Sequence, residues 1–270
     1  MLRTRLLTAA VLIPIAAVFI ALGGLPYLAL VAVSAVAAEV EFVGLLSERR
    51  FRLGHLSGIV LVAFFLADSW LKDSRFLLSG LGPILILSLA WQVLRYPRSQ
   101  ISEWTAAVGS GLYIGTCASH LVRLRVVLDD GLWWTLIAVA VTLAADAGAY
   151  GIGSLWGKRQ LAPRLSSGKT VEGYLGAILI SSLLGAALGA AWRVQAGPSS
   201  EVSWFPGLVM GAVIAVLAPL GDLAISMAKR EAGAEDSGKL LPGHGGILDR
   251  LDTLLFAGVI AHTYLSWFVY

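Results

Sequence analysis

The chain has 270 residues, of which 57% are hydrophobic and 14% are charged, and its mean hydropathy is +0.80. Soluble domains carry about 25% charged residues, so this composition excludes an ordinary soluble protein and predicts a chain embedded in a lipid bilayer. The net charge of +3 with scattered cations predicts no nucleic-acid partner, and the single cysteine excludes an internal disulfide framework.

Apolar runs of about 20 residues, the length that a helix needs to cross a bilayer, recur along the whole chain. They predict an all-α, polytopic membrane protein with about nine transmembrane helices, divided into N-terminal helices over 1–130 (about five) and a C-terminal catalytic half over 131–270. The expected spans are 6–22, 25–46, 54–71, 76–94, 104–122, 132–155, 174–192, 205–228 and 253–269. The basic start MLRTRLL also fits a signal peptide, but no small-residue cleavage site follows it, so we expect an uncleaved helix.

The Lys and Arg residues between these spans predict an orientation, because cytoplasmic loops collect basic residues. With the N-terminus inside, five of the 20 cations remain outside: Lys72, Arg75, Arg123, Arg125 and Arg193. We therefore expect a multi-pass protein of the cell (inner) membrane with a cytoplasmic N-terminus. The polar loops 156–173 and 229–252, and with them the polar site, are expected on the cytoplasmic side.

Acidic residues inside the apolar runs are candidates for function, because an intramembrane carboxylate is costly and faces a bundle interior or a wet cavity. Asp146 lies in LAADAGAYGIG and Asp222 lies in LAPLGDLAISM, both beside glycines. Glu39, Glu41 and Asp68 lack such neighbours, and for them structural and functional roles are equally open.

The first polar loop contains Gly168, Lys169 and Thr170, which invite comparison with a phosphate-binding P-loop. That pattern needs a glycine where Pro163 stands, and no strand is expected there. A Ser-Ser-Gly-Lys-Thr run at a helix start still offers amides, hydroxyls and a cation to an anion. The alternative is a loop whose basic residues only set the orientation in the membrane, with Ser or Thr as the N-cap of the next helix.

The second polar loop ends in LPGHGGILDRLD, residues 241 to 252. Asp249 and Asp252 are three residues apart, so they share a face if a helix begins there. Together with Asp222 they form an oxygen-rich set suited to Mg²⁺. The glycines at 245 and 246 let amides approach a ligand closely. The nearby cations that could hold phosphate oxygens are Lys229, Arg230, Lys239 and Arg250. His244 could equally stabilise a turn or take part in the reaction. The loop therefore predicts phosphoryl chemistry on a lipid headgroup.

The run SMAKREAGAEDSGKLLPGHGGILDRLD, residues 226 to 252, closely resembles the signature of phosphatidate cytidylyltransferases, also called CDP-diacylglycerol synthases. The block 146–173 resembles the second region of that family, so the resemblance covers the C-terminal half. The matching signature residues are Ser226, Lys229, Arg230, Asp236, Gly238, Pro242, His244, Gly245, Gly246, Asp249, Arg250 and Asp252. Three positions depart from the pattern. Glu235 stands where the family has a lysine, a charge that Lys239 could supply instead, while Ala228 and Ser167 are mild changes.

The resemblance implies that CTP and phosphatidate react to give CDP-diacylglycerol and pyrophosphate, with Mg²⁺ as cofactor. It implies metal binding by Asp222 and Asp249, with Asp146 lining the cavity or completing the shell. The residues with expected catalytic roles are Asp222, Asp249, Asp252, Lys229 and Arg230. The residues with expected substrate contacts are Lys169, Thr170, Ser226, His244, Gly245, Gly246 and Arg250.

An ion-coupled membrane transporter is the alternative function, because intramembrane acids beside glycines also mark ion pathways. The two related halves that would favour it are missing, since the blocks 146–173 and 221–252 are not repeats of one another. A phosphatidyl transferase that consumes a CDP-lipid would carry closely spaced aspartates on successive turns, and this pattern is not present. Gly185 and Gly189 form a GxxxG pattern that fits packing within the chain as well as a homodimer.

Overall fold

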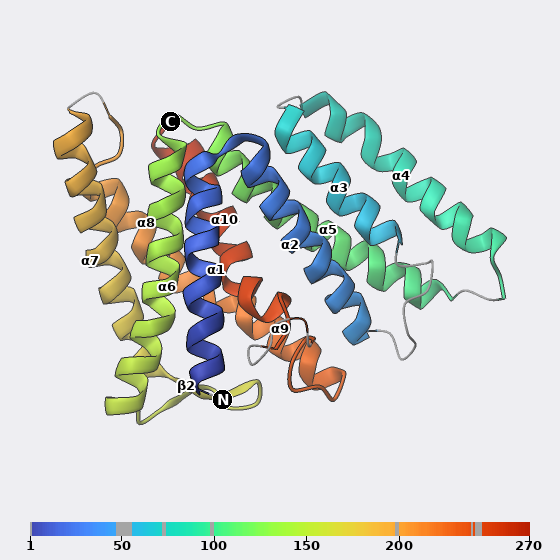
Figure 1. Cartoon of the computed structure of the whole chain (residues 1–270). Coiled ribbons are helices and arrows are strands. Elements are labelled where there is room, and N and C mark those ends of the chain that lie inside the picture. Colours follow the sequence, from blue (N-terminus) through green and yellow to red (C-terminus); the bar gives the residue numbers. More distant parts are fainter. Residues whose placement is uncertain are drawn as a thin grey trace. The chain divides into compact units, whose positions relative to one another are not determined.

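The computed structural model describes residues 2–46, 56–71, 74–97, 100–197, 200–238, 240 and 245–270. These residues form ten helices and one two-stranded hairpin (Figure 1). In chain order the elements are α1 (Leu2–Leu22), α2 (Gly24–Leu46), α3 (Leu56–Leu71), α4 (Ser74–Leu94), α5 (Ile101–Val126), α6 (Gly131–Trp156), β1 (Gln160–Ala162), β2 (Ser166–Thr170), α7 (Val171–Ala196), α8 (Trp204–Leu217), α9 (Pro219–Glu231) and α10 (Leu248–Phe268).

The prediction of an all-α membrane protein is confirmed. Lipid offers no hydrogen-bond partner to the backbone, so apolar segments satisfy their own amides by forming helices. Within the described residues, five segments are long and apolar enough to cross a membrane: Gly24–Leu46, Gly131–Trp156, Val171–Ala196, Trp204–Glu231 and Leu248–Phe268. Shorter apolar helices cover Ala10–Leu22, Leu56–Leu71 and Ser79–Leu94. The chain is thus a multi-pass helical membrane protein, and the count of nine spans stays a prediction.

The first of two compact units comprises Met1–Val126 and Glu231–Leu251. Within it α3 packs along α5, and α2 contacts both of these helices (Figure 1). Leu61, Ile114 and Val43 are fully buried between them. A buried ion pair joins α3 to α5, where Arg123 Nη2 lies 2.5 Å from Asp68 Oδ2. The segment that follows α9 belongs to this unit, together with the N-terminal helices.

The second unit comprises Val127–Arg230 and Asp252–Tyr270. Helices α6, α7 and α8 lie side by side in it, and α7 contacts both of the others (Figure 1). Glycines allow α7 and α8 to approach closely: a Cβ at Gly185 would overlap the carbonyl oxygen of Gly207, and a Cβ at Gly189 would overlap that of Ser203. The GxxxG pattern therefore serves packing within the chain and supplies no independent support for a homodimer.

Gly185→Ala is expected to destabilise the protein by about 1–3 kcal/mol, because the added methyl group meets backbone that cannot turn away. Thermal unfolding in a fixed detergent measures the change. Gly151→Ala in α6 is the matched control, since a Cβ there has open space and alanine gains about 1 kcal/mol of helix propensity over glycine. An unfolding temperature of Gly185→Ala at or above that of the wild type would contradict the close α7–α8 approach.

The expected span 205–228 is not one continuous helix. Helix α8 ends at Leu217, and α9 begins at Pro219. Proline has no amide hydrogen to continue the ladder, yet it is well suited to the first position of a new helix. The break places Asp222 in the first turn of α9, where the positive end of the helix dipole stabilises a carboxylate.

Candidate functional site

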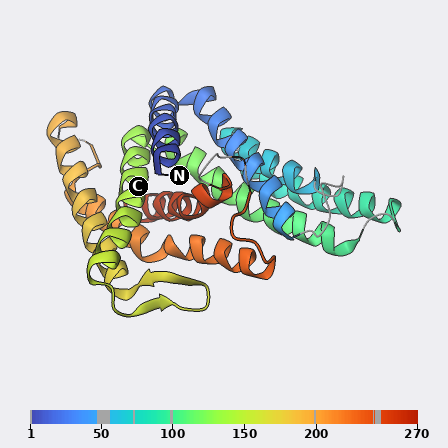
Figure 2. The ribbon, with the colours of Figure 1, turned by 60° about the horizontal axis from the view of Figure 1, so that its bottom comes forward.

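The first polar loop folds into an antiparallel hairpin, in which Gln160 pairs with Thr170 and Ala162 pairs with Ser166. Figure 2 shows it extending from the adjoining ends of α6 and α7. The expectation that no strand is available here was wrong. Pro163 favours the second position of a tight turn, and the Leu165 amide donates to the Ala162 carbonyl across that turn at 3.1 Å.

The base of the hairpin is tied to the start of α7. Thr170 is the N-cap of this helix, and its hydroxyl oxygen accepts from the Gly173 amide at 3.2 Å. Glu172 Oε2 accepts from the amides of Lys158 and Arg159 at 3.0 and 3.2 Å. A Thr N-cap is thereby confirmed, and the Ser-Ser-Gly-Lys-Thr run is a strand rather than the first turn of a helix.

Lys169, in β2, forms an ion pair with Asp222 at the start of α9. Its Nζ lies 2.5 Å from Asp222 Oδ2, and both side chains are half-buried. Ser226, one turn further along α9, donates to Asp222 Oδ1 at 3.3 Å. The first polar loop is therefore in contact with the start of α9 through Lys169 and Asp222.

Asp252 of α10 joins this group from the neighbouring helix. Helix α9 approaches α10 closely at Gly221, where a Cβ would overlap the carbonyl oxygen of Asp252. The Asp252 side chain is 7% exposed, and its Oδ1 accepts from the amide and hydroxyl of Thr253 at 2.6 and 3.2 Å. The negative charges of Asp222 and Asp146 act on it. We call Asp146, Lys169, Asp222, Ser226 and Asp252 the hairpin cluster; Asp146, in α6, is its exposed member.

A second polar group, in the first unit, surrounds Asp249. Asp249 Oδ2 accepts from the Ser237 amide at 2.8 Å, from the Ser237 hydroxyl at 2.8 Å and from the Gly246 amide at 3.1 Å. Glu41 of α2 accepts from the Leu248 amide at 2.8 Å. We call Glu41, Ser237, Gly246, Leu248 and Asp249 the signature cluster.

Helix α10 begins at Leu248, so Asp249 and Asp252 both lie in its first turns. The expected helix start before Asp249 and Asp252 is therefore present. The two carboxylates nevertheless have different hydrogen-bond partners, since Asp249 binds the preceding segment and Asp252 binds Thr253. Gly245 has a φ of +76°, a conformation that glycine adopts without strain.

The other predicted residues are distributed along the signature segment. Lys229 is half-buried, whereas Arg230, Arg250 and Glu235 are exposed. His244 and Lys239 lie outside the described residues. No three His, Cys, Asp or Glu side chains within the described part of the chain converge as a preformed metal-binding group.

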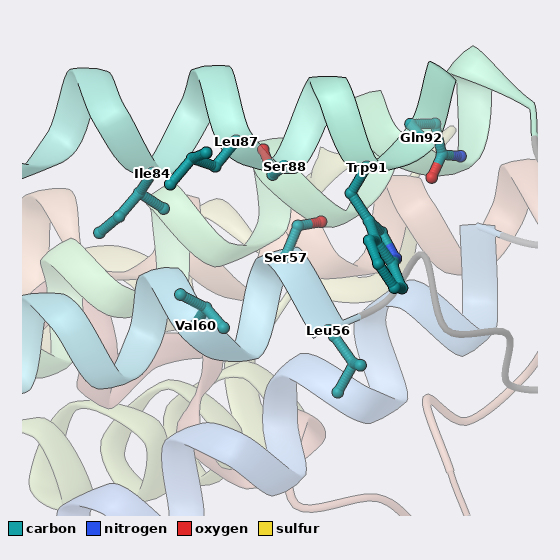
Figure 3. Close-up of a pocket in the computed structure, with 8 residues that line it drawn as sticks. All are labelled: Leu56, Ser57, Val60, Ile84, Leu87, Ser88, Trp91 and Gln92. Atoms are coloured by element: carbon teal, nitrogen blue, oxygen red, sulfur yellow. The ribbon is translucent and has the colours of Figure 1, made fainter. Parts of the chain in front are cut away.

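A pocket of about 310 Å³ lies between α3 and α4 in the first unit. Figure 3 shows Leu56, Val60, Ile84, Leu87 and Trp91 along its walls, with Ser57, Ser88 and Gln92 as its polar members. No charged side chain lines it. It therefore lacks the groups that phosphoryl chemistry needs, which belong to the two polar clusters.

Comparison with known proteins decides the family. Residues 3–268 match the model of the cytidylyltransferase family. The chain belongs to that family. The resemblance read from the signature is thereby confirmed, and it extends from the C-terminal half to nearly the whole of this cytidylyltransferase.

Individual relatives of this cytidylyltransferase agree with the family match. A protein named phosphatidate cytidylyltransferase from Bacillus subtilis (strain 168) is 30% identical over 272 residues, covering 98% of each chain. One of the same name from Staphylococcus saprophyticus is 33% identical over 190 residues, covering 70% of this chain and 69% of the relative. Another from Mycobacterium bovis is 27% identical over 253 residues, covering 89% of this chain and 80% of the relative.

Two side chains that take part in the signature cluster, those of Ser237 and Glu41, were not among the predicted site residues. Ser237 lies inside the signature but offers no charge, and Glu41 lies in the apolar run of α2, about 200 residues away along the chain. The only signal for Glu41 was an acid inside an apolar run, which it shares with Glu39 and Asp68.

Proposed function

We propose that this chain transfers the cytidylyl group of CTP to phosphatidate and forms CDP-diacylglycerol and pyrophosphate. The observation that carries the proposal is the family match over residues 3–268, together with relatives named for this activity. The matched family is a transferase, so the transporter alternative has no support. The lipid product and lipid substrate agree with a multi-pass helical membrane protein.

In this reaction a phosphate oxygen of phosphatidate attacks the α-phosphorus of CTP. A new P–O bond forms, the bond from the α-phosphorus to the bridging oxygen breaks, and pyrophosphate leaves with the electron pair. The attacking phosphate is ionised near neutral pH, so no strong base is required. The protein must position the two phosphates and balance their charge, which are the main requirements of phosphoryl transfer.

The cations of the two signature regions suit this task. Lys169 lies on the hairpin and pairs with Asp222. When substrate is bound, its ammonium group can pair with a phosphate instead of the carboxylate. Lys229 and Arg230 occupy the last turn of α9, and Arg250 is exposed in the first turns of α10. The remaining proposed substrate contacts come from Thr170, Ser226, His244, Gly245 and Gly246. Asp252 is buried beside Asp222, and we include it among the residues that take part in the transfer.

We propose Mg²⁺ as the cofactor, held by Asp222 and Asp249, with Asp146 as a further ligand. Carboxylate oxygens suit Mg²⁺, which takes one or two of them from a protein and otherwise binds water and substrate phosphates. Asp222 is half-buried, and among the described residues its Oδ1 accepts only from Ser226, at a long 3.3 Å. When bound, the ion supplies positive charge to the phosphate oxygens.

The proposed location is the cell (inner) membrane, with the N-terminus and both polar loops cytoplasmic, on the evidence of the cation distribution. Ser167 is exposed in the hairpin. Ser167→Cys is therefore expected to react with a membrane-impermeant maleimide from the cytoplasmic side only. Glu201→Cys, exposed in the expected outer loop, is the matched control and should react from the outside. The reverse pattern would overturn the orientation; the native Cys117 is buried.

The activity is tested with the purified full-length protein in detergent, supplied with CTP, phosphatidate and Mg²⁺. Equal amounts of CDP-diacylglycerol and pyrophosphate are expected. Omitting phosphatidate should abolish pyrophosphate release, which separates transfer from hydrolysis of CTP. A stable, monodisperse preparation that forms no CDP-diacylglycerol would overturn the proposal.

A further inference from the structure

We propose that Glu41 of α2 is a positioning residue for Asp249. By accepting a hydrogen bond from the Leu248 amide in the first turn of α10 and lying against the Ser237 hydroxyl, Glu41 holds the Asp249 carboxylate in the orientation that the transfer needs. The inference rests on the proposed function and adds to it a residue outside the signature.

Glu41 supplies a hydrogen-bond acceptor where α10 lacks one. The first amides of a helix have no acceptor inside it, and Leu248 is the first residue of α10. Its amide donates to Glu41 Oε2 at 2.8 Å across 207 residues of sequence. A carboxylate at this end of a helix also interacts favourably with the helix dipole. Glu41 is 7% exposed, so water does not screen these interactions.

Ser237 connects Glu41 to Asp249. Its hydroxyl oxygen lies 3.2 Å from Glu41 Oε2 and 2.8 Å from Asp249 Oδ2. A serine hydroxyl has one hydrogen, so it donates to one carboxylate at a time, and the shorter separation favours Asp249. Glu41 thus contacts Ser237, which donates to Asp249, and also Leu248, which precedes Asp249 in the chain.

The glycines of the signature segment are fitted against Glu41. A Cβ at Gly238 would overlap the Glu41 carboxyl group, and a Cβ at Gly246 would overlap both that group and the Ser237 hydroxyl. The absence of side chains at these two positions lets the backbone of Gly238 and of Gly246 lie against the carboxylate. This close fit distinguishes Glu41 from an acid that merely faces a polar neighbour.

Glu39 provides a matched comparison two residues away in the same helix. It is 1% exposed, and it accepts from the Ser110 hydroxyl of α5 at 2.7 Å. A Cβ at Gly58 in α3 would overlap it. Glu39 therefore joins the N-terminal helices to each other, whereas Glu41 joins α2 to the signature segment.

Turnover by Glu41→Met, Glu41→Gln and Glu39→Met tests the assignment. Glu41→Met keeps the length but removes the acceptor. We expect its kcat to fall about 30- to 100-fold, as misplacement of a reacting group by about 1 Å can cause, with the KM for CTP changed less than about threefold. Glu41→Gln keeps an acceptor oxygen and should recover at least about tenfold of that loss. Glu39→Met should keep its kcat within about twofold.

Hydrogen exchange of the 237–249 segment gives a readout that does not depend on activity. The amides of Ser237 and Leu248 are bonded in the signature cluster, so Glu41→Met should exchange them at least about tenfold faster. Glu39→Met should leave them unchanged. If Glu41→Met does not fold, Glu41→Leu takes its place, because it also removes the acceptor for the Leu248 amide and should lower kcat in the same way.

The outcomes separate the inference from the function on which it rests. A wild-type protein that makes no CDP-diacylglycerol would overturn the proposed function, and unchanged exchange in Glu41→Met would overturn the contact itself. Faster exchange with wild-type kcat would show that Glu41 holds the segment without serving the transfer, which also overturns the positioning role. Equal losses in Glu41→Gln and Glu41→Met would refute an acceptor role.

Discussion

Asp222→Asn is expected to lower the rate of CDP-diacylglycerol formation by about 100-fold or more at saturating substrates, comparable to the removal of one charge-stabilising group from an active site. Asparagine keeps the shape and an acceptor for Ser226. It removes the negative charge that Lys169 Nζ approaches to 2.5 Å, and with it the proposed hold on Mg²⁺. Initial rates over a range of Mg²⁺ concentrations, with the unfolding temperature measured in parallel, check both effects.

Glu231→Gln is the matched control for Asp222→Asn, because Glu231 is the exposed carboxylate at the other end of α9. It should keep the wild-type rate. The double variant Lys169→Met with Asp222→Asn should be more stable than Asp222→Asn alone, since no cation is then left without its partner, yet it should remain inactive. Near-full turnover of Asp222→Asn at saturating Mg²⁺ would contradict both the metal role and the charge role of Asp222.

Asp249→Asn is expected to reduce turnover by a similar factor, about 100-fold, and to weaken the apparent affinity for Mg²⁺. The carbonyl oxygen of asparagine can still accept from Ser237 and Gly246, which donate to Asp249 Oδ2 at 2.8 and 3.1 Å. The segment should therefore keep its conformation while the charge is lost. Turnover at several Mg²⁺ concentrations and hydrogen exchange of the 237–249 segment measure the two properties separately.

Glu235→Gln controls for the loss of any carboxylate from the same segment, because Glu235 is exposed. It should leave the rate and the Mg²⁺ dependence unchanged. If Asp249→Asn accelerates hydrogen exchange strongly, its loss of activity reflects a disordered segment. If it retains wild-type turnover at saturating Mg²⁺, Asp249 is not a metal ligand.

The helices, and much of the site, were predictable from local sequence. Apolar runs form helices because lipid leaves no other partner for the backbone, so the run near each expected span is helical. The acids and cations of the polar loops were identifiable because they break the apolar pattern. The signature at 226–252 identified the family before any contact was known, since its spacing is specific and local.

Some local features were misread although their signals were present. Pro219 interrupts the expected span 205–228, and Pro163 closes a hairpin where no strand was expected. In both cases the proline acts through the missing amide hydrogen and the restricted φ, which are local properties. The first lies within an otherwise apolar run, and the second lies in a short polar loop without the alternating apolar pattern that is typical of a strand.

By itself, the sequence determined the membrane environment, the helical class and the family, because composition, hydropathy and a short signature are properties of neighbouring residues. Only the tertiary structure decided which partner each polar side chain has. Lys169 pairs with Asp222, and Glu41 accepts from Leu248 across 207 residues. Nothing in the apolar run of α2 distinguishes Glu41 from Glu39, since both are buried acids two positions apart. Their partners differ because a hydrogen bond depends on distance and direction in space, and the folding of the helices sets both.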